Sequence, residues 1–179
     1  MSSDMGGLWH ATRELHHKAE GHPVAKRMVD GTISPQEWAD WLHAMWTIHS
    51  ALDPHLPLCA RRADAFASDL LALLPVVPHA SRAATHYAAA LTDIPGIFGA
   101  AYITIGAHRR GGRVVERAMR EHGVDLPHQH IDFDQPQDVE RLINKWRATP
   151  ALAPGARRAF EVLYCVMEEI EGRRDGTAT

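Results

Sequence analysis

Residues 11–20 read ATRELHHKAE, and this stretch is the most informative one for the fold and the site. His16 precedes Glu20 by four positions, so on a helix the two side chains lie on one face within reach of each other. A histidine that binds a metal through one ring nitrogen holds its other N–H against an acceptor, and a carboxylate is a good acceptor. The pair therefore predicts an axial metal ligand with a supporting carboxylate, although the same spacing is also typical of an ordinary surface pair.

Length and composition place the chain among globular proteins. Its 179 residues fit a single domain, with flexible ends expected at residues 1–7 and 173–179, and 45% of the residues are hydrophobic. The formal net charge of −3 argues against nucleic-acid binding, and no apolar run is long enough to span a membrane. The first residues lack the plan of a secretory signal, and Cys59 and Cys165 have neither zinc-site nor disulfide-framework spacing. These features predict a cytoplasmic protein.

Hydrophobic periodicity and capping signals predict helices along the chain and almost no strand. Ser34, Pro35 and Glu37 supply an N-cap, a first-turn proline and a capping-box carboxylate for one long helix through Leu52. The fold class expected is therefore a single all-α domain. Further helices are expected at residues 8–20, 24–29, 63–74, 81–91, 96–122, 137–147 and 154–171, with a loop at 124–136.

The expected helix at residues 96–122 contains an unusual cluster of glycines. Gly106, Gly111 and Gly112 lie close together, and each glycine inside a helix costs about 1 kcal/mol relative to alanine. Close packing against another helix, or a helix end near Gly111, would explain them. A large flat ligand lying against the backbone would also explain them, because only a residue without Cβ permits that approach. The sequence leaves both explanations open.

Together these segments resemble the biliverdin-forming haem oxygenases of bacterial type. Residues 11–20 are similar to the first-helix motif of that family, residues 46–53 (WTIHSALD) to its second helix, and residues 102–112 (YITIGAHRRGG) to its distal helix. The resemblance covers residues 8–55 and 95–120, and the rest of the chain matches in helix content only.

The resemblance implies a helical bundle that holds haem between a proximal helix and a glycine-rich distal helix. His16 would be the axial iron ligand and Glu20 its hydrogen-bond partner, while Gly106, Gly111 and Gly112 would leave room on the distal face. The implied reaction cleaves haem to biliverdin, CO and ferrous iron with O₂. Electrons would come from an external reductase or ferredoxin, because the chain has no flavin or iron–sulfur motif.

The resemblance also implies contacts at the rim of the haem. Arg13 lies on the same helical face as the axial histidine and would bind a propionate, and Tyr102 matches a tyrosine at the haem edge. Arg147 matches a basic position only loosely, and a solvated charge is the simpler interpretation. Thr12 and Ala19, which belong to the first-helix motif, complete the expected haem contacts.

His108 departs from the family pattern. In an ungapped alignment it replaces the distal aspartate, and Ala107 and Gly106 replace a glycine and a leucine; a shift by one residue restores a glycine at Gly106. Three roles remain open for this imidazole. It could organise distal water, since an unperturbed histidine titrates near pH 6.5. It could bind iron directly and exclude O₂, or it could face solvent beside Arg109 and Arg110.

Other classes of function also remain open. A non-enzymatic haem-binding or sensor protein would share His16 but lack turnover. A di-iron oxidase needs carboxylates and histidines from four helices. Residues 14–17 and 40–43 supply acid-x-x-His elements, but residues 100–115 carry no carboxylate. A thiaminase-like enzyme would need an activated cysteine, and neither cysteine has an obvious activating neighbour.

Arginines form a basic stripe along the expected distal helix. Such a stripe could dock an acidic electron-donor protein, and it could equally be an exposed face paired with glutamates. The arginines concerned are Arg109, Arg110, Arg113, Arg117 and Arg120.

Overall fold

A computed structural model describes residues 7–174 and 176, and in these residues the fold is entirely helical, which confirms the expected all-α class. No helix in this part of the chain combines the length and hydropathy needed to cross a membrane. The α-helices are α1 (Gly7–Glu20), α2 (Pro23–Val29), α3 (Pro35–Leu52), α4 (Ala63–Ala72), α5 (Arg82–Ala90), α6 (Ile94–Gly106), α7 (Gly112–Glu121), α8 (Pro136–Arg147) and α9 (Ala153–Arg174).

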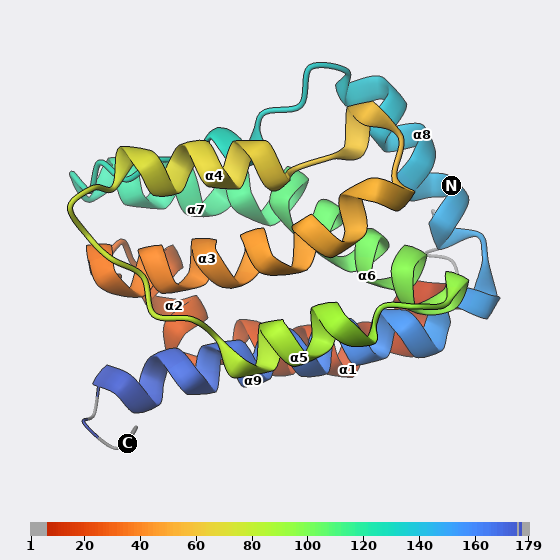
Figure 1. Ribbon diagram of the computed structural model, residues 1–179, viewed down its shortest axis with the longest axis horizontal. Coiled ribbons are helices and arrows are strands. Elements are labelled where there is room, and N and C mark those ends of the chain that lie inside the picture. Colours follow the sequence, from red (N-terminus) through yellow and green to blue (C-terminus); the bar gives the residue numbers. More distant parts are fainter. Residues whose placement is uncertain (1–6, 175, 177–179) are drawn as a thin grey trace.

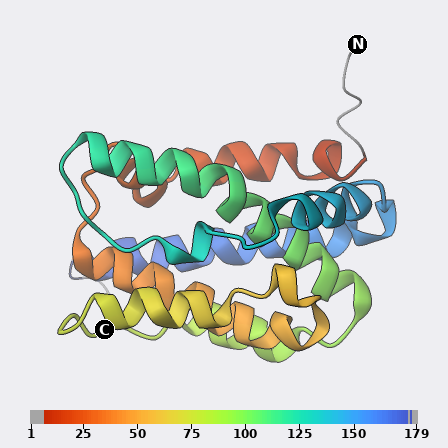
Figure 2. The same cartoon turned by 90° about the horizontal axis from the view of Figure 1, so that it is seen from above.

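The long C-terminal helix α9 is the central element of the bundle. It packs against α6, α1, α5 and α3. In Figure 2, α1 overlaps α7 at the edge of the molecule opposite α3 and α4, whereas Figure 1 separates the two helices, with α7 near the top of the view and α1 beside α9 near the bottom. Helix α2 connects α1 to α3 and packs against α7.

The predicted start of α3 is confirmed in detail. The Ser34 hydroxyl accepts a hydrogen bond from the Glu37 N–H, and the Glu37 carboxylate accepts one from the Ser34 N–H. This reciprocal capping box satisfies two amide groups at the helix start, and Pro35 has no N–H to satisfy.

Some expected boundaries differ from the structure. The expected helix at 96–122 is divided into α6, one π-helical turn η3 (Ala107–Gly111) and α7. At the C-terminus, Arg173 and Arg174 belong to α9, and residue 7 already belongs to α1, although both ends were expected to be flexible. The remaining residues of those expected ends, 1–6, 175 and 177–179, lie outside the described residues.

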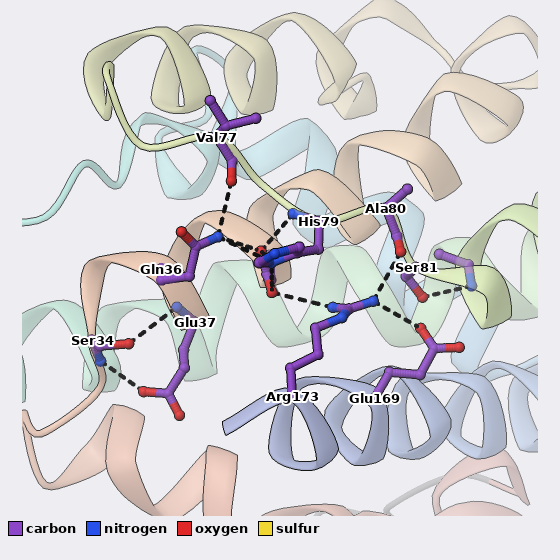
Figure 3. A network of polar contacts seen from close by, with 11 residues as sticks. Ser34, Gln36, Glu37, Val77, His79, Ala80, Ser81, Glu169 and Arg173 are labelled. Carbon is purple, nitrogen blue, oxygen red and sulfur yellow. Dashed lines mark hydrogen bonds and ion pairs between the residues drawn. The ribbon is translucent and has the colours of Figure 1, made fainter. Parts of the chain in front are cut away.

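A buried carboxylate explains why α9 is ordered as far as Arg173. Asp40 of α3 accepts hydrogen bonds from Arg173, from the backbone N–H of His79 and from the Gln36 side chain. Arg173 also donates to the carbonyl of Ala80, and Gln36 donates to the carbonyl of Val77 (Figure 3). The network therefore joins α3, the segment before α5 and the end of α9.

Close contact between α6 and α9 depends on glycine. A Cβ built on Gly99 would lie 2.5 Å from the backbone nitrogen of Ala156, and one built on Gly155 would overlap the carbonyl of Pro95. Backbone atoms cannot swing away as a side chain can. These two glycines therefore set the distance between the two helices.

We expect Gly155→Ala to lower the free energy of unfolding by about 3 kcal/mol, because the added methyl group forces α6 and α9 apart. Urea denaturation followed by far-UV circular dichroism measures this. Gly106→Ala is the matched control, because no atom lies within 4 Å of a Cβ at that position. An unchanged unfolding midpoint for Gly155→Ala would show that the helices are not held this closely.

Candidate functional site

Helix α1 packs on α9 through Leu8 and Thr12, which are both buried. The Thr12 hydroxyl donates to the carbonyl of Leu8, 2.8 Å away, so it is satisfied within its own helix. Ala19 is half-buried and packs against the same core. Thr12 and Ala19, which the resemblance places in contact with haem, therefore lie on the side of α1 that faces the core.

His16 lies on the neighbouring stripe of α1 and is partly accessible. Its ring packs against Trp9 of α1 and Phe160 of α9, with centroids 5.3 and 5.7 Å apart. The side chain is 34% exposed. Two aromatic neighbours therefore orient the imidazole while a part of it remains open to a ligand.

The expected pairing of His16 with Glu20 is present. His16 Nδ1 lies 3.3 Å from Oε2 of Glu20. This nitrogen is buried and lacks a well-aligned hydrogen bond in the described part of the chain. Because Nδ1 is turned toward the carboxylate, Nε2 at the other side of the ring is directed away from it. An imidazole in this orientation presents Nε2 to an incoming metal.

The glycines of the segment that runs from α6 through η3 into α7 do not share one role. A Cβ on Gly106 or on Gly111 would meet no atom within 4 Å, whereas a Cβ on Gly112 would lie 2.5 Å from Cγ2 of Ile131. Gly112 is therefore needed for packing. Gly106 and Gly111 mark the start and the end of the π-helical turn, and both have open space on the side where a Cβ would stand. Such single π turns often lie at functional sites.

The expected rim residues lie in different surroundings. Arg13 is exposed and has no hydrogen bond or ion pair within the described residues, so its guanidinium is available. Tyr102 is 9% exposed and lies one helical turn before Gly106. Arg147 ends α8 and donates to the side chain of Asn144, 3.2 Å away.

His108 is buried inside the bundle, so the solvent-facing alternative is wrong. Its side chain leaves the π-helical turn toward α3 and α4, and the residue is 5% exposed. His108 Nε2 lies 3.2 Å from Nε2 of His49 in α3. The rings of Phe66 and His130 pack against it, with centroids 5.0 and 5.4 Å away.

Two aspartates border this histidine cluster, which comprises His49, His108 and His130. His130 Nδ1 lies 2.6 Å from Asp69, and both side chains are buried. His49 Nδ1 lies 3.7 Å from Asp53, the residue after α3. Asp53 in turn accepts the backbone N–H groups of residues 62 and 63, and Asp69 those of residues 129 and 130. His49 and His130 thus each lie beside a carboxylate that backbone N–H groups fix in place.

Sequence reasoning missed His49, His130 and Asp69 as part of a site. Asp53, like His49, appeared only as part of the segment 46–53 that resembles the second helix of the family. The one signal in the sequence was the count of 13 histidines. Their spacing along the chain does not indicate a cluster, because α3, η3 and the short 3₁₀ turn η4 (Gln129–Ile131) meet only in the folded protein.

Burial controls the protonation of the cluster. Burial lowers the pKa values of His49 and His130, and the neighbouring aspartates offset only part of that effect. Burial lowers the pKa of His108 well below its usual range, and the nearby His49 and His130 lower it further. Burial favours a higher pKa for Asp53, but the contact with His49 and the backbone N–H groups outweigh it and lower the pKa. At neutral pH the three imidazoles are therefore neutral.

We expect acid to destabilise the protein through this cluster. An unfolded histidine binds a proton near pH 6.5, whereas a buried histidine with a lowered pKa does not. Stability is therefore retained above about pH 6.5 and lost as the pH falls toward the native pKa, by up to about 1.4 kcal/mol per pH unit for each histidine. Urea unfolding at pH 7.5 and 5.5 measures the loss, which His108→Gln should reduce.

His10→Gln replaces an exposed histidine of α1 and serves as the control for that measurement. If His108→Gln lost as much stability between the two pH values as the unmodified chain, His108 would not titrate differently in the folded and unfolded states.

The arginine stripe is largely paired with acids. Glu140 of α8 binds Arg109 and Arg110. Glu116 binds Arg113 and Arg120, and Asp132 binds Arg113 as well. Within the described residues, Arg117 alone of the five has no such partner. The stripe is therefore mainly an exposed face of internal ion pairs.

A di-iron centre has no basis in the described part of the chain. Among the described residues, one group of three side chains has donor atoms close enough to share a metal ion. It comprises His16, His17 and Glu20 of α1. Asp40, from one of the two acid-x-x-His elements, is occupied by Arg173 and His79. A four-helix carboxylate site therefore does not form from these elements.

Comparison with known proteins finds similarity in structure only. No protein-family model matches the sequence, and no curated protein matches it. The structure of a haem oxygenase from Leptospira interrogans aligns with a TM-score of 0.77 at 14% identity, over 90% of this chain and 97% of that one. Haem oxygenase-1 from the cyanobacterium Synechocystis, solved in complex with haem, aligns with a TM-score of 0.74 at 14% identity, over 95% and 91%.

Proposed function

We propose that this chain, which has the fold of the haem oxygenases, binds haem between α1 and the α6–η3 segment and cleaves it to biliverdin, CO and ferrous iron. The observation that carries the proposal is that two helical segments each present a surface suited to one side of a haem. Helix α1 presents the Nε2 face of His16, and the α6–η3 segment presents Gly106 and Gly111 beside open space.

The residues on α1 suit the iron side of a haem. His16 would bind the iron through Nε2. Glu20 would accept the Nδ1–H, which fixes the tautomer and increases the basicity of the ligand. Trp9 and Phe160 would keep the ring in place, since both pack against it. Arg13 lies one helical turn from His16 with an unpaired guanidinium, which suits a propionate.

The residues of the α6–η3 segment suit the other side of the disc. Gly106 and Gly111 have no side chains, so a flat ring system could approach the backbone closely. Tyr102 lies one turn before Gly106 and would contact the rim. Haem would supply both the iron that reacts with O₂ and the ring that is opened. The protein would supply orientation, exclusion of bulk water and protons.

Proton handling is the role that we propose for His108. The imidazole lies on the turn between the two open glycines, and its Nε2 faces Nε2 of His49 at 3.2 Å. A proton shared between these two nitrogens could pass from one ring to the other, and Asp53 beside His49 would stabilise the charged form. Because its Nε2 is already engaged with His49, His108 is poorly placed to bind the iron directly.

The experiment that tests the function is a haem titration followed by reduction. Haemin added to the purified chain should give the sharp Soret band of histidine-ligated haem at one haem per chain. Ascorbate, or a ferredoxin with its reductase, should then yield biliverdin, detected by chromatography, and CO, trapped by reduced myoglobin.

Two results would contradict the proposal in different ways. Haem binding without biliverdin under either electron source would indicate a carrier or sensor, the alternative with the same ligand. Failure to bind haem would remove both functions. An external electron donor is part of the proposal, because this chain has no flavin or iron–sulfur motif. The proposal also places the reaction in the cytoplasm.

A further inference from the structure

A second histidine, next to the proposed iron ligand, is not used in the proposed haem-binding arrangement. His17 lies on the exposed face of α1, with 66% of its side chain accessible. Its Nδ1 lies 3.6 Å from Oε2 of Glu20, the same oxygen that lies 3.3 Å from Nδ1 of His16. The three donor atoms lie within 4.8 Å of one another. Two imidazole nitrogens therefore converge on one carboxylate.

These separations suit a tetrahedral metal ion. With metal–ligand bonds of about 2.0–2.1 Å, neighbouring ligand atoms of a tetrahedron lie roughly 3.4 Å apart. The two nitrogen–oxygen distances are close to that value. Two imidazoles and a carboxylate are a donor set for zinc and related transition ions, whereas magnesium and calcium prefer oxygen donors.

The surroundings of the three side chains also favour a bound metal ion. Nδ1 of His16 is buried beneath its neighbours and has no well-aligned hydrogen bond among the described residues. The His16 and His17 rings are nearly perpendicular, at 86°, with centroids 6.0 Å apart. Glu20 and His17 are both mostly exposed, so they can adjust around an ion. A metal ion bound at this place would give Nδ1 of His16 a partner.

We propose that His16, His17 and Glu20 form a zinc site, with the two Nδ1 atoms and the carboxylate as ligands and water in the fourth position. The site shares Nδ1 of His16 and the Glu20 carboxylate with the proposed haem-binding arrangement. We also infer that zinc and haem compete for this site, an inference that rests on the proposed function. An imidazole that carries zinc on Nδ1 has no N–H to donate to Glu20, and two cations on one neutral ring would compete for its electron density.

The site is tested by titrating the metal-free chain with Zn²⁺ in the absence of haem, using isothermal calorimetry. We expect one tight equivalent, and His17→Ala should weaken it at least tenfold. His10→Ala, which removes another exposed histidine of α1, should leave the affinity unchanged. Co²⁺ in place of Zn²⁺ should give the intense visible bands of a four-coordinate ion. Equal zinc affinity for His17→Ala and the unmodified chain would overturn the site.

Competition is tested by repeating the haemin titration with one equivalent of Zn²⁺. We expect the apparent Kd for haemin to rise at least tenfold in the unmodified chain and to stay unchanged in His17→Ala, which keeps the proposed haem ligand. If the apparent Kd for haemin in the unmodified chain were the same with and without Zn²⁺, the proposed competition would be overturned. A metal-free chain that binds no haemin would contradict the proposed function, and the calorimetric zinc titration would still decide the zinc site.

Discussion

His16→Ala should lose the Soret band of histidine-ligated haem and reduce biliverdin formation to background. The substitution removes the proposed iron ligand, and no other histidine of α1 has a carboxylate behind its ring in the same orientation and aromatic neighbours on both sides. Absorption spectra of the haemin complex and single-turnover assays with ascorbate measure both effects.

The matched control is His17→Ala, at the adjacent exposed position, which should keep the spectrum and the turnover. Added imidazole should restore much of the Soret band in His16→Ala, because it can fill the space left by the side chain. Glu20→Ala should give an intermediate loss of about 10–100-fold in activity, as expected for a residue that orients a ligand. Turnover by His16→Ala without imidazole would refute the ligand assignment.

Gly111→Leu should fold normally yet fail to bind and turn over haem. No atom lies within 4 Å of a Cβ at this position, and Gly111 is exposed, so we expect the haem-free protein to accommodate the new side chain. Replacing glycine inside a helix should even raise the stability by about 0.5–1 kcal/mol. The added side chain would, however, fill the space that the proposal gives to haem. Urea unfolding and haemin titration measure the two effects separately.

Gly106→Leu should behave like Gly111→Leu, and Gly112→Leu should not. A Cβ at Gly112 meets Ile131, so that variant should lose stability first. The contrast among three neighbouring glycines separates a ligand surface from a packing surface. If Gly111→Leu and Gly106→Leu bound and cleaved haem as the unmodified chain does, the open glycines would serve only the shape of the helix.

Local sequence was sufficient for most of the helices. The Ser34–Glu37 capping box and the periodicity up to Leu52 predicted α3 with its correct start and end. The same signals could not predict the π-helical turn, because this single turn with i→i+5 hydrogen bonds depends on what packs around it.

The site was predictable only where its geometry is local. His16 and Glu20 are neighbours on any helix, so their pairing follows from a spacing of four. His108 illustrates the opposite case. Its three possible roles could not be separated until its ring was placed beside His49, from a helix about 60 positions away in the chain.

By itself the sequence determined an all-helical domain and an imidazole–carboxylate pair on the first helix, because both follow from interactions within a few residues. The tertiary structure alone decided that Gly106 and Gly111 face open space while Gly112 packs against Ile131. It alone assembled the histidine cluster. The physical reason is that burial and long-range contact depend on how helices pack, and one helix cannot reveal which of its faces another will cover.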